Sequence, residues 1–307
     1  MLPVTTQCKN LKMLTIMQHC ARGSRVFAVA AGVTALVGCT AVKEKRLSHM
    51  PLVSGARYVS LGSSYAAGPG VTVSADTPSN RCARSSDNYA HQLAKRFNLS
   101  LVDVACSGAT TAHILGNWDD LPPQIDAVTP DTRLVTITIG GNDVSFVRNL
   151  IALACKAAPQ PPADAPGGRC PTVKIPSDAD WNSLTTGLNR TAQEVRRRAP
   201  QARLVFVQYL RIVPAGFACR AVPIDDEGLA QVRAIQIKLA SLTAATARKW
   251  AAKVIDPIER NVAHDPCASV PWATGFPIPG GPPLVPFHPN HAGMSAIAEL
   301  LTKSVKP

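Results

Sequence analysis

The sequence predicts an α/β fold with a mostly parallel five-stranded sheet, because short apolar runs alternate with longer helical patterns. Parallel strands need a crossover connection, which a helix between two strands supplies. Five runs have the composition and length of buried strands: 58–61, 101–105, 134–139, 204–208 and 253–255. No internal repeat or linker interrupts the chain after residue 50, so one domain over residues 52–307 accounts for the pattern.

The segments between these runs carry apolar residues at helical spacing. The stretch SSDNYAHQLAKRF, residues 85–97, begins with a Ser/Asp cap and places three apolar side chains on one face. Three further segments have a helical pattern: 181–199, 227–251 and 291–303. Three long connections are expected to be loops beside the ligand site: 144–180, 209–228 and 264–287.

The first 39 residues have the layout of an export signal. Residues 26–38 form an uncharged, mostly apolar run after Arg22 and Arg25, too short for a comfortable membrane span. The run ends in Leu-Val-Gly-Cys, which resembles the lipobox of bacterial lipoproteins, where the cysteine is lipidated. We therefore predict a signal peptide with a lipobox over 1–39, lipidation at Cys39, a spacer over 40–51 and anchoring to a membrane surface. An ordinary signal peptide or a single anchoring helix is the alternative.

The charge of the chain does not indicate a nucleic-acid partner. Loss of the four cations ahead of Cys39 lowers the formal net charge from +12 to +8, since no acidic residue precedes it. The cluster Arg196–Arg198 is not accompanied by interleaved aromatic residues or a nucleic-acid motif, so we interpret it as a solvated helix end. We expect a monomer.

Six cysteines follow Cys39, and an even number in an exported chain predicts disulfides. Six cysteines allow fifteen pairings, among which the sequence does not choose. The simplest pairing is sequential: Cys82–Cys106, Cys155–Cys170 and Cys219–Cys267. No C-x-x-C or clustered Cys/His spacing supports metal binding, and we predict neither a metal nor an organic cofactor. The chain is expected in the cell envelope or secreted.

The ends of the predicted strands carry the residues with catalytic potential. In an open parallel sheet, ligands bind beyond the carboxyl ends of the strands. Four blocks lie there or near the C-terminus: Gly-Ser-Ser at 62–64, Ala-Cys-Ser-Gly at 105–108, Gly-Gly-Asn-Asp at 140–143 and His-Pro-Asn-His-Ala-Gly at 288–293. A serine, a histidine and several N–H donors are the parts of an acyl-transfer site. The serine attacks, the histidine removes its proton, and the donors stabilise the oxyanion.

These four blocks in this order resemble the SGNH, or GDSL-type, hydrolase family, and the resemblance covers residues 57–303. It implies a flavodoxin-like three-layer α/β/α sandwich and serine esterase or lipase chemistry. Block by block, it implies Ser64 as nucleophile and His288 as base. It also implies an oxyanion hole formed by the backbone N–H groups of Ser64 and Gly108 and the side-chain amide of Asn142.

Two positions depart from the family pattern. The first block usually reads Gly-Asp-Ser, and here Ser63 replaces the aspartate as a neighbour of the nucleophile or a helix N-cap. The family usually has an acid three residues before the histidine, where this chain has Val285. Some family members also lack this acid and use a main-chain carbonyl. We therefore predict a Ser64–His288 dyad in which the Val285 carbonyl accepts from Nδ1.

Other reactive side chains receive lesser roles. Asp256 and Asp265 are alternatives for orienting the histidine, if their loops fold back onto it. We interpret His291 as a surface residue at a helix N-terminus, and Asp143 as a carboxylate that holds its own loop. The first block is not the Gly-x-Ser-x-Gly elbow of α/β-hydrolases, because residue 66 is alanine.

The sequence thus predicts an exported serine esterase or lipase that forms an acyl-enzyme. Expected substrates are lipid esters, phospholipids or acylated sugars, among which the resemblance does not choose. Two other classes stay open. An acyltransferase would use the same residues, and a non-catalytic surface lipoprotein with this fold is the class that the missing acid favours.

Overall fold

The computed structural model describes residues 52–157, 169–258, 260–278, 281 and 283–305. The predicted signal peptide, Cys39 and the spacer lie outside the described residues. Within the described part of the chain, no helix is long and apolar enough to cross a membrane. The same residues contain no group of three His, Cys, Asp or Glu side chains arranged to hold a metal ion.

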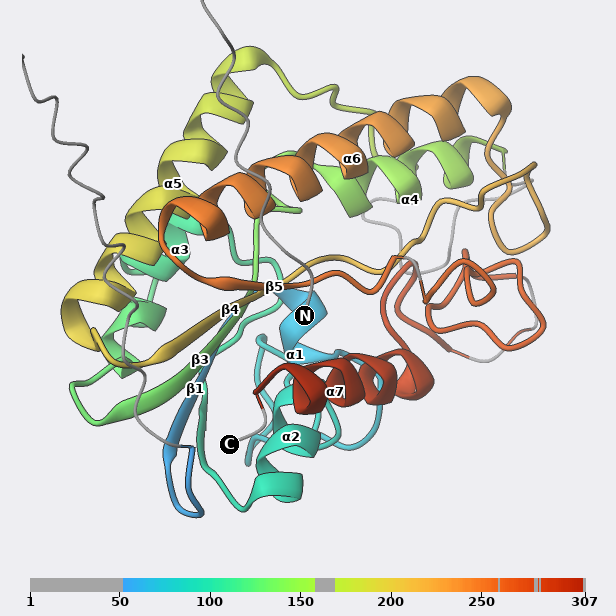
Figure 1. The fold of residues 1–307 in the computed structure, drawn as a ribbon. Helices are drawn as coiled ribbons and strands as arrows, with labels where there is room; N and C mark the ends of the chain where they lie inside the picture. Colours follow the sequence, from blue (N-terminus) through green and yellow to red (C-terminus); the bar gives the residue numbers. More distant parts are fainter. Residues whose placement is uncertain (1–51, 158–168, 259, 279–280, 282, 306–307) are drawn as a thin grey trace, which may run out of the picture. The chain divides into compact units, whose positions relative to one another are not determined.

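Five parallel strands form one sheet in the order β2-β1-β3-β4-β5 (Figure 1). The strands are β1 Arg57–Gly62, β2 Ser100–Asp103, β3 Thr132–Thr138, β4 Arg203–Val207 and β5 Lys253–Ile255. All four pairings are parallel, which confirms the predicted α/β fold, with strand limits shifted by at most two residues. The strand order changes direction between β1 and β3, and ligands bind at such switch points in this topology.

Helices cover both faces of the sheet, as the three-layer prediction requires. In Figure 1, α1, α2 and α7 lie on one side and α3, α4, α5 and α6 on the other. The helices are α1 Ser64–Ala67, α2 Tyr89–Phe97, α3 Thr111–Leu115, the 3-10 helix η1 Gln124–Ala127, α4 Phe146–Ala157, α5 Asp178–Arg198, α6 Asp226–Lys249 and α7 His291–Val305. Packing of α2 on α7, and of α6 on both α4 and α5, completes each outer layer.

The core is densest around the two central strands. Tyr58, Val59 and Leu61 of β1 are fully buried, as are Leu134 and Ile137 of β3. Side chains of this kind each contribute roughly 1.5–3 kcal/mol through burial. The strands that carry the candidate site at their carboxyl ends are therefore the most firmly held part of the fold.

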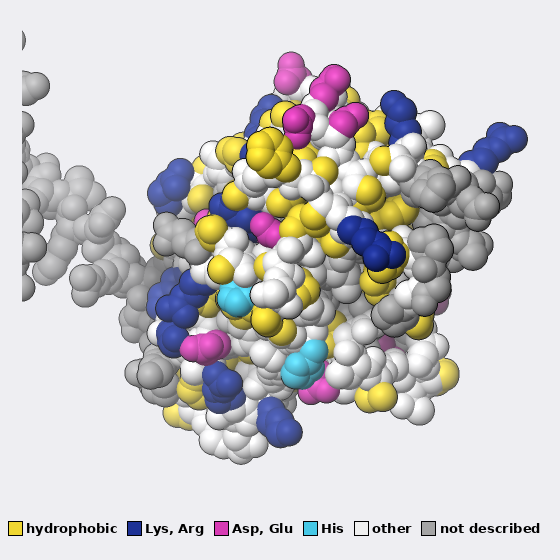
Figure 2. Space-filling view, turned by 90° about the vertical axis from the view of Figure 1, so that its right-hand side faces the viewer, with side chains coloured by type: hydrophobic (Ala, Val, Ile, Leu, Met, Phe, Trp, Pro, Cys, Tyr) yellow, Lys and Arg dark blue, Asp and Glu magenta, His cyan; other side chains and the backbone are white. Residues whose placement is uncertain are grey.

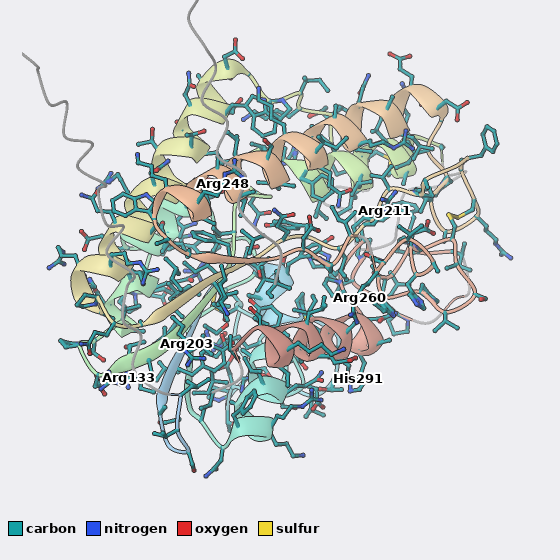
Figure 3. The ribbon with its side chains drawn as sticks, in the orientation of Figure 1. Arg133, Arg203, Arg211, Arg248, Arg260 and His291 are labelled. Carbon is teal, nitrogen blue, oxygen red and sulfur yellow. A yellow bond between two sulfur atoms is a disulfide. The ribbon has the colours of Figure 1, made fainter. Side chains whose placement is uncertain are left out.

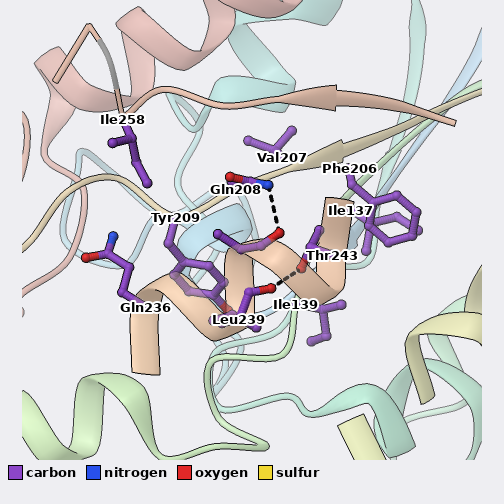
Figure 4. Close-up of a pocket in the computed structure, with 11 residues that line it drawn as sticks. Ile137, Ile139, Phe206, Val207, Gln208, Tyr209, Gln236, Leu239, Thr243 and Ile258 are labelled. Carbon is purple, nitrogen blue, oxygen red and sulfur yellow. Dashed lines mark hydrogen bonds between the residues drawn. The ribbon is translucent and has the colours of Figure 1, made fainter. Parts of the chain in front are cut away.

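The layer between the sheet and α6 is filled by side chains (Figure 4). A cavity of about 10 Å³ lies there, lined by Ile137, Phe206, Gln208, Leu239 and their neighbours. Gln208 donates from Nε2 to the Ala240 carbonyl at 3.1 Å. A cavity of this volume holds about one water molecule at most, so this layer is scaffold and does not admit a substrate.

Two details of the predicted helices are wrong. Residues 146–157, which were expected to belong to a loop, form α4, because Phe146, Leu150 and Ala154 recur every four residues and are buried. The N-cap of α2 is Asn88, whose Oδ1 accepts from the N–H groups of Ala90 and His91, rather than the preceding Ser/Asp pair.

The six cysteines that follow Cys39 form the three sequential disulfides: Cys82–Cys106, Cys155–Cys170 and Cys219–Cys267. The simplest of the fifteen pairings is therefore the one that the fold adopts. Disulfides persist in oxidising compartments, which agrees with a protein that leaves the cytoplasm.

The arginine cluster lies at the C-terminal end of α5, as predicted, and makes structural contacts. Arg196 donates to the carbonyls of Ala202, Trp250 and Ala251. Arg197 and Arg198 form ion pairs with acidic side chains. On the face drawn in Figure 2, lysine and arginine side chains are interrupted by apolar, acidic and neutral ones.

Candidate active site

The turn after β1 brings Ser64 to the carboxyl edge of the sheet. Gly62 has φ +144°, and a Cβ atom there would lie 2.4 Å from the Thr138 carbonyl oxygen, so the turn requires glycine. The Gln124 side chain holds both the N–H and the carbonyl of Gly62, at 2.8 and 3.0 Å. Ser64 is then the first residue of α1. Its backbone N–H makes no hydrogen bond within the described part of the chain, as is usual for the first turn of a helix.

His288 faces Ser64 across the edge of the sheet. Nε2 lies 2.7 Å from Ser64 Oγ, and the side chains are nearly buried, with 7 % and 9 % of each residue exposed. Nδ1 lies 2.8 Å from the carbonyl oxygen of Pro286. A carbonyl only accepts, so Nδ1 carries the proton and Nε2 offers its lone pair to the serine hydroxyl. This tautomer is the one that a general base needs.

The structure places the Pro286 carbonyl, rather than the predicted Val285 carbonyl, at Nδ1. The prediction was wrong by one residue, because the Val285 carbonyl accepts from the Thr274 hydroxyl at 2.5 Å. Phe287 explains the difference: its φ of +58° turns the chain between Pro286 and His288, so that the imidazole folds back onto the Pro286 carbonyl.

Neither alternative carboxylate reaches the histidine. Asp256 accepts from the backbone N–H of Ile258 at 3.0 Å, and Asp265 from that of Cys267 at 2.9 Å. Within the described residues, neither makes a hydrogen bond or ion pair with His288. His291 opens α7 as an exposed residue (Figure 3), which is the surface position predicted for it.

The surroundings of His288 favour its neutral form. Burial lowers the pKa of His288 from 6.5 to about 4, and the hydrogen bond to the Pro286 carbonyl raises it by a smaller amount. Among the residues that the structure describes, no carboxylate bonds to the imidazole; such a carboxylate would raise the pKa of His288. At neutral pH the imidazole is therefore uncharged and able to accept a proton from Ser64.

The other serine of the pair points into the protein. Ser63 Oγ lies 3.5 Å from the Thr138 carbonyl and 3.4 Å from the Tyr209 hydroxyl. Ser63 occupies the N-cap position of α1, but its side chain makes no capping bond. The Tyr209 hydroxyl also accepts from the Gly141 N–H at 2.8 Å, so it joins the first block to the third. The geometry therefore separates the two serines, with Ser64 facing the base.

The second and third blocks lie together beside the nucleophile turn. Gly108 has φ +87°, and its N–H makes no hydrogen bond within the residues that the structure describes. Asn142 donates from Nδ2 to the Ala109 carbonyl at 2.9 Å, and the second proton of that amide has no acceptor within the described residues. Free N–H groups at a strand edge can stabilise a developing oxyanion.

Asp143 fastens these two blocks to each other. Its carboxylate accepts from the Thr111 N–H at 3.1 Å and from the Thr111 hydroxyl at 2.5 Å. Burial raises the pKa of Asp143, and the bonds from Thr111 oppose that rise. The sequence predicted that this carboxylate holds its own loop, whereas its side chain bonds to Thr111 at the start of α3.

The Cys82–Cys106 disulfide fixes the backbone of the second block. Ser107 donates its N–H and its hydroxyl to the Cys82 carbonyl, at 3.1 and 2.8 Å. Gly108 follows directly, so its backbone N–H is held by a covalently fastened turn.

We expect the double substitution Cys82→Ser and Cys106→Ser to lower the free energy of unfolding by about 3 kcal/mol, and also to lower kcat. The matched control is Cys155→Ser with Cys170→Ser, which removes the disulfide at the C-terminal end of α4. That pair should lose comparable stability and keep kcat. Urea unfolding and initial rates measure both. Equal kcat losses in the two double variants would show that the disulfide does not support the site specifically.

Sequence reasoning missed two side chains of this site, Gln124 and Tyr209, and one backbone carbonyl, that of Pro286. Gln124 and Tyr209 contact glycines that are 62 and 68 residues away in the chain, and no local pattern connects them. Pro286 was missed because its role depends on the backbone angle of Phe287, for which the sequence carries no signal.

Comparisons with known proteins show what this chain is similar to. Residues 60–296 match the GDSL-like Lipase/Acylhydrolase family, a range that takes in all four blocks. "Lipase 2" of Streptomyces coelicolor is 35 % identical over 248 residues, which are 79 % of this chain and 83 % of that protein. A lipase of Streptomyces rimosus is 28 % identical over 252 residues, covering 80 % and 85 %.

Solved structures show the same fold. An extracellular lipase from Streptomyces rimosus aligns with a TM-score of 0.63 and 25 % identity, covering 81 % of this chain and 99 % of that one. Phospholipase A1 from Streptomyces albidoflavus aligns with a TM-score of 0.64 and 24 % identity, covering 83 % and 100 %.

Proposed function

We propose that this chain, which belongs to the GDSL-like lipase/acylhydrolase family, hydrolyses carboxylic esters through a Ser64–His288 dyad and a covalent acyl-enzyme. One observation carries the proposal. Ser64 Oγ lies 2.7 Å from Nε2 of a neutral imidazole whose Nδ1–H is already held by a carbonyl. This is the arrangement of a nucleophile and its general base.

In the acylation step, Ser64 Oγ attacks the ester carbonyl carbon while Nε2 of His288 takes the hydroxyl proton. The negative charge that forms on the carbonyl oxygen is stabilised by the N–H groups of Ser64 and Gly108 and by the Asn142 amide. Nε2 then gives its proton to the leaving alcohol. A water molecule repeats the sequence on the acyl-enzyme, and Ser64 regains its proton. Through both steps, Nδ1–H stays on the Pro286 carbonyl.

The substrate proposed is a lipid ester, a phospholipid acyl chain or an acylated sugar, with lipid esters favoured because the relatives are named lipases. Export is supported by the three disulfides and by the extracellular lipase among the similar structures. Anchoring to a membrane through a lipid on Cys39 remains part of the proposal.

Rates on a series of p-nitrophenyl esters, from acetate to palmitate, test the function. A lipase should prefer the longer chains, and an esterase the acetate or butyrate. The same assay with an added alcohol separates hydrolysis from transfer, because a transferase makes the new ester in preference to the free acid. No turnover of any ester by the folded protein would favour the non-catalytic lipoprotein.

The pH dependence follows from the environment of His288. Burial sets the pKa of His288 to about 4, so kcat/KM should keep its plateau down to pH 5 and fall with an acid limb near pH 4. Initial rates on a short ester between pH 3.5 and 8 measure this limb. A limb at the usual histidine value of about 6.5 would contradict the buried, neutral imidazole.

The stability of the fold needs to be followed in the same samples. Because the folded pKa lies below the unfolded one, the contribution of neutral His288 is fully present above pH 6.5. It is lost progressively as the pH falls from 6.5 toward 4. Circular dichroism at each pH distinguishes unfolding from protonation of the base.

A further inference from the structure

The four consecutive carbonyl groups of residues 285–288 each accept a hydrogen bond from a different donor group. Two of the donors belong to Thr274: its hydroxyl donates to the Val285 carbonyl at 2.5 Å, and its N–H donates to the His288 carbonyl at 2.8 Å. His288 Nδ1 takes the Pro286 carbonyl, and the Tyr65 hydroxyl takes the carbonyl of Phe287. Three of these four carbonyls are thus held by donors outside the loop, and the fourth, that of Pro286, is held by His288 itself.

Tyr65 connects this loop to the nucleophile. It follows Ser64 in α1 and is almost fully buried, and its ring lies 5.2 Å from the imidazole and 4.5 Å from the Tyr209 ring. Burial raises the pKa of Tyr65 well above 10, so its hydroxyl stays protonated and donates to the Phe287 carbonyl. The hydrogen bond from Tyr65 therefore lies beside the Ser64–His288 contact and joins the same two segments.

Thr274 holds the other side of the loop. Its hydroxyl accepts from the His288 N–H at 3.0 Å and donates to the Val285 carbonyl, so one hydroxyl spans both ends of the 285–288 segment. The chain between them contains Phe287 with its positive φ, a conformation that needs support from its surroundings. The two hydrogen bonds of this hydroxyl supply that support.

We propose that Tyr65 and Thr274 are positioning residues that hold the His288 loop in place, which is the orienting part of what an acidic side chain does in a triad. The inference rests on the proposed function and deepens it. The Pro286 carbonyl belongs to the same loop as His288, so it orients the ring only as well as the loop itself is fixed. Tyr65 fixes the loop against the nucleophile helix, and Thr274 fixes its two ends. A displacement of about 1 Å at such a site costs on the order of 100-fold in rate.

Because few titratable groups surround the imidazole, a change in the position of the loop can be followed through the pKa of His288. Tyr65 on α1 is the titratable side chain in contact with the ring, and Tyr209 packs behind Tyr65. Within the described residues, His288 has no ion pair with a carboxylate, lysine or arginine. Loosening the loop admits water to the ring, which weakens the burial effect and raises the pKa of His288.

The central variant is Tyr65→Phe, which removes one hydroxyl and keeps the ring. We expect kcat to fall roughly 10- to 100-fold with KM unchanged, and the acid limb of kcat/KM to move up from pH 4. Tyr58→Phe is the control. Tyr58 is a buried tyrosine of β1 whose hydroxyl lies 2.7 Å from Thr136 Oγ1 and makes no hydrogen bond to the loop within the described residues. It should keep the wild-type kcat and acid limb.

Thr274 supplies an independent pair of variants. Thr274→Val removes the hydroxyl at constant shape and should reproduce the fall in kcat and the shift of the acid limb. Thr274→Ser restores the hydroxyl and should recover both. This rescue keeps the test valid even where Tyr65→Phe does not fold.

Wild-type kcat and an unmoved acid limb in folded Tyr65→Phe, or no rescue by Thr274→Ser, would overturn the positioning role. A wild-type protein that hydrolyses no ester would instead refute the proposed function. In that case the positioning role can still be tested by an NMR titration, because this measures the pKa of His288 without any catalytic turnover. A higher pKa in Tyr65→Phe than in the wild type supports the positioning role, and an equal pKa overturns it.

Discussion

Ser64→Ala is expected to lower kcat for ester hydrolysis roughly 10⁴- to 10⁶-fold, the scale seen when a serine nucleophile is removed. No other hydroxyl takes its place in the described structure, because Ser64 Oγ is the hydroxyl bonded to Nε2 of His288. Stability should change little, since the hydroxyl makes no other hydrogen bond there. Initial rates and thermal unfolding of purified protein measure both quantities.

Ser63→Ala is the matched control for this prediction. Its hydroxyl makes two long contacts, with the Thr138 carbonyl and the Tyr209 hydroxyl, and faces away from the base. Its removal should leave kcat close to the wild-type value. If Ser63→Ala lost activity as severely as Ser64→Ala, or if Ser64→Ala retained it, the assignment of the nucleophile would be wrong.

Asn142→Ala is expected to lower kcat by a factor of about 10² to 10³, with little change in KM. The amide has one proton on the Ala109 carbonyl and a second free to meet charge that appears only in the transition state. An interaction of that kind affects kcat rather than substrate binding. Steady-state kinetics on one soluble ester provide the test.

Asn189→Ala is the control for the loss of an amide. Asn189 lies on α5, where its Nδ2 donates to the Thr185 carbonyl at 2.8 Å and its Oδ1 accepts from Trp250. Its loss should affect stability and leave kcat unchanged. A wild-type kcat in the Asn142→Ala enzyme would show that this amide is not part of the oxyanion hole.

The sheet and the position of the site could be predicted from sequence because both depend on local patterns. Each strand is a short apolar run, and the parallel arrangement follows from the helices between the runs. The rule that ligands bind at carboxyl ends then selected the segments to inspect, and the family resemblance assigned Ser64, Gly108 and Asn142 within them. The fold brings the segments that carry them to one edge.

The remaining parts of the site could not be predicted, because they depend on contacts between distant residues or on one backbone angle. Gln124 is hydrogen-bonded to Gly62, and Thr274 is hydrogen-bonded to the loop of His288. These contacts form only when the chain is folded. Whether the Val285 or the Pro286 carbonyl bonds to the imidazole depends on the positive φ of Phe287. A phenylalanine in the sequence gives no indication of a positive φ.

The absence of a carboxylate at Nδ1 gives this site a distinct electrostatic character. A carboxylate would stabilise the imidazolium that forms when Ser64 is deprotonated, whereas a carbonyl supplies only a dipole. The same absence, together with burial, keeps the pKa of His288 at about 4 and its ring neutral in mildly acidic solution. We therefore expect activity at acidic pH and dependence on a firmly held loop as two consequences of one arrangement.

The most direct test of the dyad is to locate the adduct of a fluorophosphonate, a reagent that phosphonylates activated serines. Trypsin releases Ser64 in the peptide Tyr58–Arg81, which contains no cysteine and is therefore free of disulfides. Mass spectrometry should find one adduct, on Ser64, in the wild type and in Ser63→Ala, and none in Ser64→Ala. An adduct on Ser63, or labelling of Ser64→Ala at the wild-type rate, would contradict the Ser64–His288 dyad.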